Sequence, residues 1–228
     1  PYISVVGGGA TGIQFLFEIA HFIKRKKMEC GLRLIHSSER VLQQFPEGFS
    51  EYTEAKMHDL DIDFQQNTYY QKQTENSILL KSKKTKKEFE LPSKITLLFL
   101  GNNPEKRLSA NTFGQVIINN QPIRDIFIAG DCSNYDSCGS NTMSAQSSVR
   151  KGRLAACNIL RDSSILKIFE PYLHQDLGYV ISLGPKDAVG WLAVEKNVVG
   201  GTPALLLKET VESQYDLLLA TGIDTYLM

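Results

Sequence analysis

The sequence predicts an α/β fold built on a parallel sheet, and three observations predict it. An apolar, β-branched run at 2–6 (YISVV) leads into GGGATG and then into an apolar-periodic stretch at 13–23, the order of strand, turn and helix. Residues 32–35 read as a second strand, and the resulting βαβ unit must have parallel strands and a right-handed crossover. The nearly all-apolar run at 95–100 is typical of a central parallel strand covered on both faces.

The remaining elements follow from local pattern and turn residues. Two apolar runs flank the segment KSKKTKK, which predicts a hairpin with a solvated, lysine-rich tip. In chain order we expect a helix at 51–60, a strand at 62–64, the hairpin strands at 77–80 and 88–91, strands at 116–118 and 126–129, a helix at 144–160, strands at 180–183 and 188–194, and a helix at 211–220.

Composition excludes several classes of protein. The 228 residues carry 25 Lys and Arg against 25 Asp and Glu, so no net charge favours nucleic acid. No apolar run approaches the roughly 20 residues that span a bilayer. The four cysteines form no CxxC pair and the histidines have no metal-ligand spacing, so no metal site is predicted. We expect a cytoplasmic setting, and because Pro1 directly precedes a strand, we interpret the chain as a piece of a longer protein.

The glycine-rich turn predicts dinucleotide binding. Gly7, Gly9 and Gly12 form GxGxxG between a strand and a helix, the context that gives this pattern its meaning. Gly7 would allow the tight turn, Gly9 the approach of a pyrophosphate, and Gly12 close helix–strand packing, with the phosphates on the helix N-terminus. The alternative is a turn used only for packing. The candidate cofactor-binding residues here are Gly7, Gly8, Gly9, Ala10, Thr11 and Gly12.

The end of the second strand bears on which nucleotide binds. An Asp or Glu usually accepts there from the adenosine ribose, whereas this chain has His36, followed by Ser37 and Arg40. These residues remove a charge that would repel a 2′-phosphate and add donors that could hold one. The alternative is that Glu39 takes the ribose and Arg40 lies on the surface. NAD(H) and NADP(H) therefore both remain open.

Further motifs extend over most of the chain. These are SSERVLQQFPEGFSEY, GNNP, IRDIFIAGDC, SAQSSVRKG, LGYVISLGPKDAVGW and GGTPALLLK. Together with GGGATG they resemble segments of the flavin-dependent pyridine nucleotide-disulfide oxidoreductases, in particular the type II NADH dehydrogenase branch. The resemblance implies a Rossmann-like NAD(P)-binding domain at 1–100, the second segment of an FAD-binding domain at 101–164, and a small α+β C-terminal region at 165–228.

The resemblance also implies an activity and site residues. In that family a hydride passes from NAD(P)H to FAD, and electrons pass on to a quinone-like acceptor. Asp131, next to Gly130, would bind the ribityl chain of FAD, and Gly101 would lie in the nucleotide cleft. Ala145 and Gln146 would open a motif beside the flavin and the quinone.

The chain departs from the family pattern in three places. Gln14 stands where the family has a Glu near the nicotinamide, while Glu18 remains, and these two are our catalytic candidates. Arg150 replaces a second Gln in the quinone site, so Gln146 and Arg150 are the substrate candidates. The earlier GxGxxG that binds FAD is absent from this stretch, so we expect the chain as given to be inactive alone. A non-catalytic nucleotide-binding module, or a reductase with a disulfide, ferredoxin or sulfide partner, is the alternative.

Two further expectations concern surfaces. The segment 215–220 offers an apolar face, which predicts either peripheral contact with the inner face of the membrane or a packed core. Apolar sheet surface left without its FAD segment favours a homodimer or strand exchange.

Overall fold

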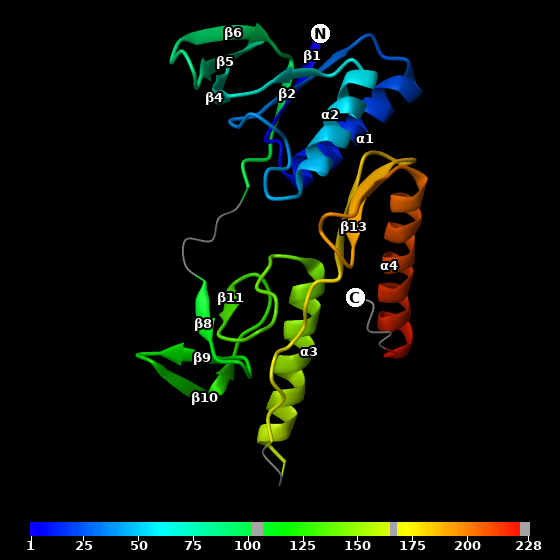
Figure 1. Cartoon of the computed structure of the whole chain (residues 1–228). Helices are drawn as coiled ribbons and strands as arrows, with labels where there is room; N and C mark the ends of the chain where they lie inside the picture. Colours follow the sequence, from blue (N-terminus) through cyan, green and yellow to red (C-terminus); the bar gives the residue numbers. More distant parts are fainter. Residues whose placement is uncertain (102–106, 165–167, 224–228) are drawn as a thin grey trace. The chain divides into compact units, whose positions relative to one another are not determined.

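The computed structural model describes residues 1–101, 107–164 and 168–223 (Figure 1). Contacts group these residues into two compact units, one made of 1–101 with the C-terminal segment from Gly178 onward, the other ending at Leu177. The expected domains at 1–100, 101–164 and 165–228 stay a prediction. Of the motif GNNP, only Gly101 lies within the described residues.

A parallel sheet forms the centre of the first unit. Its strands lie in the order β3-β2-β1-β7, and α1 connects β1 to β2. Val6 lies opposite Ile35 on one side of β1 and opposite Leu98 on the other, with all pairs parallel. The α/β prediction is confirmed. The bounds are β1 Tyr2–Val6, α1 Ala10–Lys26, β2 Gly31–Ile35, α2 Glu47–Asp59, β3 Asp63–Gln65 and β7 Ile95–Leu98.

The prediction that 95–100 is a central strand was wrong. The strand β7 ends at Leu98 and pairs only with β1 among the described residues, so it is the edge of the sheet. Ile95 and Leu98 are about half exposed, at 52% and 48%. An apolar run indicates that a segment forms a strand, but it does not indicate how many neighbouring strands pair with it.

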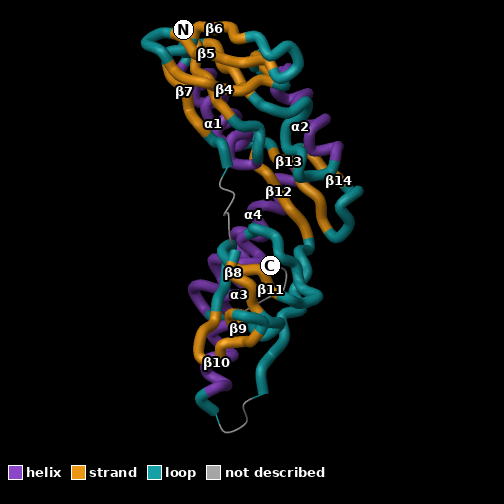
Figure 2. Tube along the Cα trace, turned by 90° about the vertical axis from the view of Figure 1, so that its left-hand side faces the viewer, coloured by secondary structure: helices purple, strands orange, loops and turns teal. Residues whose placement is uncertain are grey.

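The helices α1 and α2 lie between the parallel sheet and a second, antiparallel sheet. Both contact that sheet, which has the order β12-β13-β14 and whose strands α4 also contacts (Figure 2). The hydroxyl of Tyr52 on α2 donates to Asp187 Oδ1 across 2.9 Å, and Lys56 lies 3.2 Å from Asp187 Oδ2. One core therefore joins both parts of this unit. The bounds are β12 Gly178–Ser182, β13 Ala188–Leu192, β14 Val198–Gly200 and α4 Thr202–Thr221.

A third sheet packs its apolar side chains against Val6 and Ile35 of the parallel sheet. It contains the predicted hairpin and an additional strand, in the order β4-β5-β6. Ile78 and Leu80 are fully buried in this contact. The bounds are β4 Thr68–Gln73, β5 Ser77–Ser82 and β6 Glu88–Pro92.

The second unit combines a small sheet with one long helix. The sheet has the order β10-β9-β8-β11, and the segment after α3 is tied back to the helix, because Asn158 donates to the carbonyls of Phe113 and Glu170. The hydrophobic core of this unit contains Ala110, Tyr135, Leu154 and Tyr172. The bounds are β8 Leu108–Ala110, β9 Gln115–Ile118, β10 Gln121–Phe127, β11 Ser133–Tyr135 and α3 Ala145–Asp162.

The last helix is longer than expected. It begins at Thr202 rather than near 211, because Gly201 adopts a positive φ of 78° and Pro203 stands at the start of the helix. Within α4 only Ala204 is buried, whereas Leu217 and Leu219 are exposed, so the packed-core alternative for 215–220 is not realised. Among the described helices, none has the length and apolarity needed to cross a membrane.

Candidate functional site

The turn between β1 and α1 can be built only with glycine at two positions. Gly7 has a φ of 114°, and a Cβ there would lie 2.0 Å from the carbonyl oxygen of Phe99. A Cβ on Gly12 would lie 2.0 Å from the carbonyl oxygen of Gly7. Gly7 thus permits the turn and Gly12 permits close packing of α1, as the spacing predicts.

Gly9 leaves room at the helix N-terminus. It is the N-cap of α1, with a φ of −80°, and the nearest heavy atom to a Cβ built there is Gln44 Nε2 at 3.9 Å. No side chain caps the helix, and its first turn, which contains Ala10 and Thr11, carries no acidic residue. The space and the positive end of the helix dipole fit a pyrophosphate.

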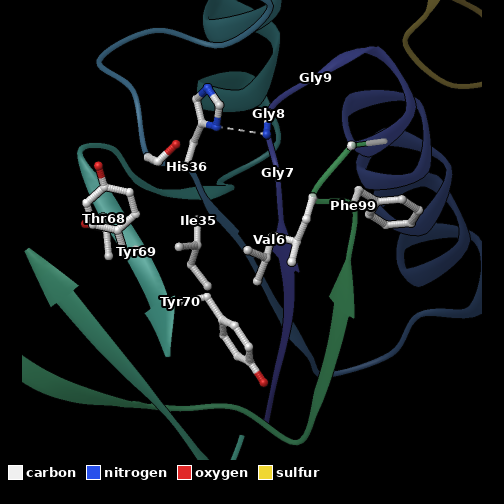
Figure 3. A pocket seen from close by; sticks show the side chains of 13 residues that line it. Val6, Gly7, Gly8, Gly9, Ile35, His36, Thr68, Tyr69, Tyr70 and Phe99 are labelled. Carbon is white, nitrogen blue, oxygen red and sulfur yellow. Dashed lines mark hydrogen bonds between the residues drawn. The ribbon is translucent and has the colours of Figure 1, made fainter. Parts of the chain in front are cut away.

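A pocket of about 340 Å³ opens at the carboxyl ends of β1, β2 and β7 (Figure 3). It brings together the predicted residues Gly7, Gly8, Gly9, His36, Ser37 and Gly101. The sequence did not predict the rest of its lining, which is Val6, Ile35, Thr68, Tyr69, Tyr70, Phe99 and Leu100. Recognising the β-prone run TYYQKQ as a strand beside β5 would have placed the two tyrosines near this edge.

His36 is hydrogen-bonded to the glycine turn. The backbone N–H of Gly8 donates to His36 Nδ1 across 3.1 Å, so the hydrogen of the neutral ring sits on Nε2. Burial lowers the pKa of His36, and the nearby Lys83 ammonium lowers it further, against a raising contribution from a hydrogen bond with the Arg40 backbone. The ring is therefore neutral at pH 7 and carries its one N–H donor at Nε2.

Six predicted residues of the first unit lie outside the pocket lining, namely Ala10, Thr11, Gly12, Gln14, Glu18 and Arg40. The guanidinium of Arg40 donates to Ser50 Oγ across 2.5 Å and to the carbonyls of Gln43 and Phe45. Arg40 therefore braces the loop before α2, and its expected role toward a 2′-phosphate does not match this geometry. Gln14 and Glu18 lie one turn apart on α1, the first half-buried and the second exposed.

The second unit holds the residues expected beside a flavin. Gly130 has a φ of 77°, and apart from its two chain neighbours no described residue has a heavy atom within 4 Å of a Cβ built there. The exposed Asp131 follows it, and its Oδ1 accepts from Ser148 Oγ on α3 across 2.8 Å. Ala145, Gln146 and Arg150 occupy the first two turns of the same helix. The open backbone beside Gly130 and an exposed carboxylate fit a polyhydroxylated chain.

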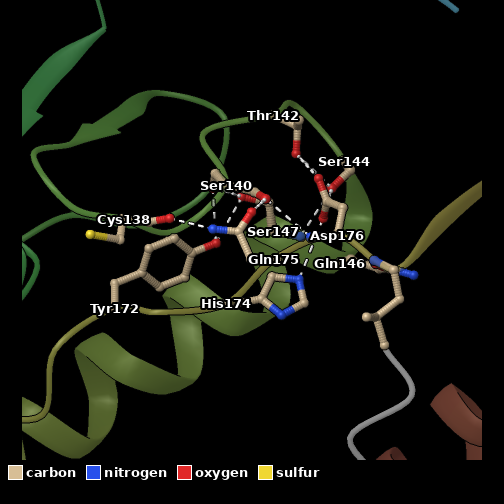
Figure 4. A network of polar contacts seen from close by, with 11 residues as sticks. Cys138, Ser140, Thr142, Ser144, Gln146, Ser147, Tyr172, His174, Gln175 and Asp176 are labelled. Atoms are coloured by element: carbon tan, nitrogen blue, oxygen red, sulfur yellow. Dashed lines mark hydrogen bonds and ion pairs between the residues drawn. The ribbon is translucent and has the colours of Figure 1, made fainter. Parts of the chain in front are cut away.

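A polar network fixes the start of α3 (Figure 4). Ser144 caps the helix by accepting from Ser147 N across 3.0 Å, and its hydroxyl donates to Asp176 Oδ1. Thr142 also donates to Asp176, and His174 lies 3.4 Å from it. Burial alone would raise the pKa of Asp176, but these partners together hold it below its ordinary value. The loop before α3 is thereby held in one conformation.

Comparison with known families decides the family. The model for the pyridine nucleotide-disulphide oxidoreductases matches residues 2–152. The chain belongs to the pyridine nucleotide-disulphide oxidoreductase family. The match runs from β1 into α3, so it includes the glycine turn, the end of β2 and Asp131.

Solved structures of low sequence identity share the fold of this chain. Two are of NDH2 from Plasmodium falciparum, one with NADH (TM-score 0.73) and one with RYL-552 (TM-score 0.72), each 16% identical over 88% of this chain. The chain spans only 58% and 59% of those two chains. A third is an engineered water-forming NADPH oxidase bound to NADPH, with a TM-score of 0.60 and 17% identity over 83% of this chain and 42% of that one.

Proposed function

We propose that this chain is the NAD(P)H-binding portion of a flavin-dependent oxidoreductase. The observation that carries the proposal is the glycine turn, which meets the N-terminus of α1 and opens into the pocket at the end of β2. In open α/β sheets ligands bind at the carboxyl ends of the strands, and this is where the pocket lies. The family match and the NADH and NADPH named for the structural neighbours support the same class of ligand.

Different residues of the first unit would bind different parts of a dinucleotide. The turn at Gly7–Gly9 and the backbone N–H groups of Ala10 and Thr11 would hold the pyrophosphate. His36 and Ser37 would lie beside the adenosine ribose, while Gln14 and Glu18 would form the wall next to the nicotinamide. This chain's part is to bind and orient the reactive ring.

The residues of the second unit would face the flavin. Asp131 would accept from hydroxyls of the ribityl chain, beside the open backbone of Gly130. When both cofactors are bound, the nicotinamide supplies a hydride and the flavin takes it up. The chain itself supplies no general acid or base for that transfer in this proposal. The Asp176 network would keep the first turn of α3, with Ala145 and Gln146, in a fixed position.

The electron acceptor is proposed to be quinone-like, with Gln146 and Arg150 as hydrogen-bond donors to its oxygens. The support is the resemblance of SAQSSVRKG to the quinone-side motif of type II NADH dehydrogenases. A disulfide, ferredoxin or sulfide acceptor is the alternative. Peripheral contact with the inner face of the membrane, through the exposed Leu217 and Leu219, and a homodimer belong to the same proposal.

The test is a titration of the purified chain with NADH and with NADPH, followed by nucleotide fluorescence, with the visible spectrum checked for flavin. Binding of either nucleotide supports the proposal. Binding of neither, by a chain with a native far-UV spectrum, overturns it. For the reaction, a preparation that holds FAD should lose its flavin absorbance anaerobically when the preferred nucleotide is added, and a quinone should restore it.

A further inference from the structure

The pocket carries no negative charge where the adenosine ribose would bind. Its thirteen lining residues, all within the described part of the chain, include no Asp or Glu. Sites that prefer NADH usually place a carboxylate at the end of β2, where it accepts from the 2′-hydroxyl and repels a 2′-phosphate. Here His36 and Ser37 hold that place, and the exposed Glu39 is not part of the lining.

The lysine-rich hairpin brings a positive charge to this position. At the start of β4, Thr68 N donates to the carbonyl of His36 and Asn67 N donates to that of Ser38, so the segment after β2 is anchored to the third sheet. Lys83 N donates in turn to the carbonyl of Asn67 across 2.7 Å. The ammonium of Lys83 donates across 3.3 Å to the carbonyl of Ser37, a residue of the pocket lining.

Arg40 does not supply this charge. Its guanidinium donates to Ser50 Oγ and to two loop carbonyls, so these donors are engaged within the loop before α2. Within the described part of the chain, the exposed ammonium of Lys83 has one hydrogen bond, a long one to a neutral carbonyl. A phosphate oxygen would replace it with a stronger, charge-assisted bond.

We propose that Lys83 determines the nucleotide specificity of this site by binding the 2′-phosphate of NADP(H). The chain therefore binds NADPH more tightly than NADH. This inference rests on the proposed function, since it names which of the two nucleotides the site takes. The neutral ring of His36 adds a donor from Nε2, and the absence of a carboxylate from the lining removes the repulsion.

The experiment is calorimetric titration of the whole chain with NADPH and NADH at low and physiological salt, with Lys83→Ala and Lys83→Arg beside it. Lys84→Ala is the matched control, because Lys84 is an exposed lysine of the same hairpin turn. We expect the wild-type chain to prefer NADPH by about tenfold. Lys83→Ala should weaken NADPH binding by about five- to tenfold and leave NADH within about twofold, as loss of one charge-assisted contact requires. Lys83→Arg and Lys84→Ala should keep the preference.

Each other outcome overturns the inference. A wild-type preference for NADH, or unchanged NADPH binding in Lys83→Ala, removes Lys83 from recognition while the proposed function stands. Equal losses of NADPH affinity in Lys83→Ala and Lys84→Ala would mean that the overall charge of the hairpin attracts the nucleotide, and that no single contact with Lys83 does. If neither nucleotide binds, the proposed function fails as well, so the two failures are distinguishable. A far-UV spectrum of each variant confirms that it is folded.

Discussion

The backbone N–H of Gly8 donates to Nδ1 of His36, which ties the phosphate-binding turn directly to the end of β2. The contact is close on both sides, because a Cβ on Gly8 would lie 2.9 Å from Cγ of His36. The bond requires an unprotonated Nδ1. Protonation of Nδ1 would break this bond, whereas the bond from Gly7 N to the carbonyl of Ile35 across 2.9 Å would remain.

Acid should weaken this connection. The pKa of His36 in the folded chain lies below its ordinary value of 6.5, so the unfolded chain binds the proton more readily. The contribution of His36 to the free energy of unfolding is complete above pH 6.5 and declines as the pH falls from 6.5 toward the folded pKa. Lys83 acts in the same direction. Urea denaturation at about pH 8 and about pH 5, followed by the fluorescence of Trp191, measures this decline in the free energy of unfolding.

His36→Asn is the control for that measurement, because an amide oxygen can accept from Gly8 N–H without titrating. It should lose part of the acid sensitivity of the wild-type chain. An equal pH dependence in both proteins would assign the effect to other groups.

Glycine substitutions in the turn should separate folding from binding. Gly7→Ala places a Cβ 2.0 Å from the Phe99 carbonyl at a φ of 114°, so we expect a loss of about 3 kcal/mol or more in the free energy of unfolding. Gly9→Ala meets no atom closer than 3.9 Å at an ordinary φ, and an N-cap exchange of this kind costs only about 1 kcal/mol. Its methyl group stands where the pyrophosphate would approach, so nucleotide affinity should fall by at least about tenfold. Thermal unfolding and nucleotide titration of both variants measure the difference, and full binding by Gly9→Ala would contradict the placement.

Local sequence patterns were sufficient for the elements of the βαβ unit. Gly7 and Gly12 are required by the geometry of one turn, and such a requirement is visible as residue spacing. The place of β7 was not visible, since strand order depends on contacts between distant segments. The same limit applies to 178–222, whose residues join the first unit through contacts such as Tyr52 with Asp187.

The site was predicted at the glycine turn, at the end of β2 and at Gly101. Tyr69 lines it from the third sheet, and Lys83 in the turn after β5 donates to the carbonyl of the lining residue Ser37. The sequence indicated this sheet only as a solvated hairpin. Arg40 was predicted as a donor to a 2′-phosphate because its proximity to His36 in sequence suggested a shared ligand. The carbonyls of Gln43 and Phe45 take its donors instead, and a loop's internal hydrogen bonds leave no periodic signal.

A buried ion pair should contribute measurably to the stability of the first unit. Arg33 is only 4% exposed, and its Nε lies 2.6 Å from Asp63 Oδ2. Its Nη1 donates to the carbonyl of Pro92, and the guanidinium lies over the Tyr2 ring. Asp63→Ala leaves that cation buried without its counter-ion, and because Asp63 is partly exposed we expect a loss of about 2 kcal/mol.

The matched control is Glu212→Gln, which breaks the pair between Lys208 and Glu212 on α4. That pair joins neighbouring turns at the helix surface, so its loss should cost no more than about 0.5 kcal/mol. Denaturation followed by Trp191 fluorescence compares the two. Equal losses in the free energy of unfolding would show that the burial of Arg33 does not strengthen its ion pair.

The last prediction concerns a lysine buried in the second unit. Lys151 is 1% exposed, its Nζ donates to Asn141 Oδ1 across 3.1 Å, and it lies 5.0 Å and 5.7 Å from the ring centroids of Tyr135 and Tyr172. Burial lowers the pKa of Lys151, which shows that the fold disfavours its charge. Lys151→Met keeps the length of the apolar stem and removes that charge. Asn141 Oδ1 keeps a donor in the variant, because Tyr135 N also donates to it across 2.9 Å.

We therefore expect Lys151→Met to unfold at the same temperature as the wild-type chain or higher, with a gain of up to about 1 kcal/mol. The size of this gain should depend on pH. Because the folded pKa lies below the ordinary value of 10.5, the cost of the charge is present at neutral pH and fades as the pH approaches 10.5, so the advantage of methionine should shrink in alkali. Scanning calorimetry at about pH 7 and about pH 10 measures it. A clear destabilisation at pH 7 would mean that the two tyrosine rings and Asn141 compensate the ammonium fully.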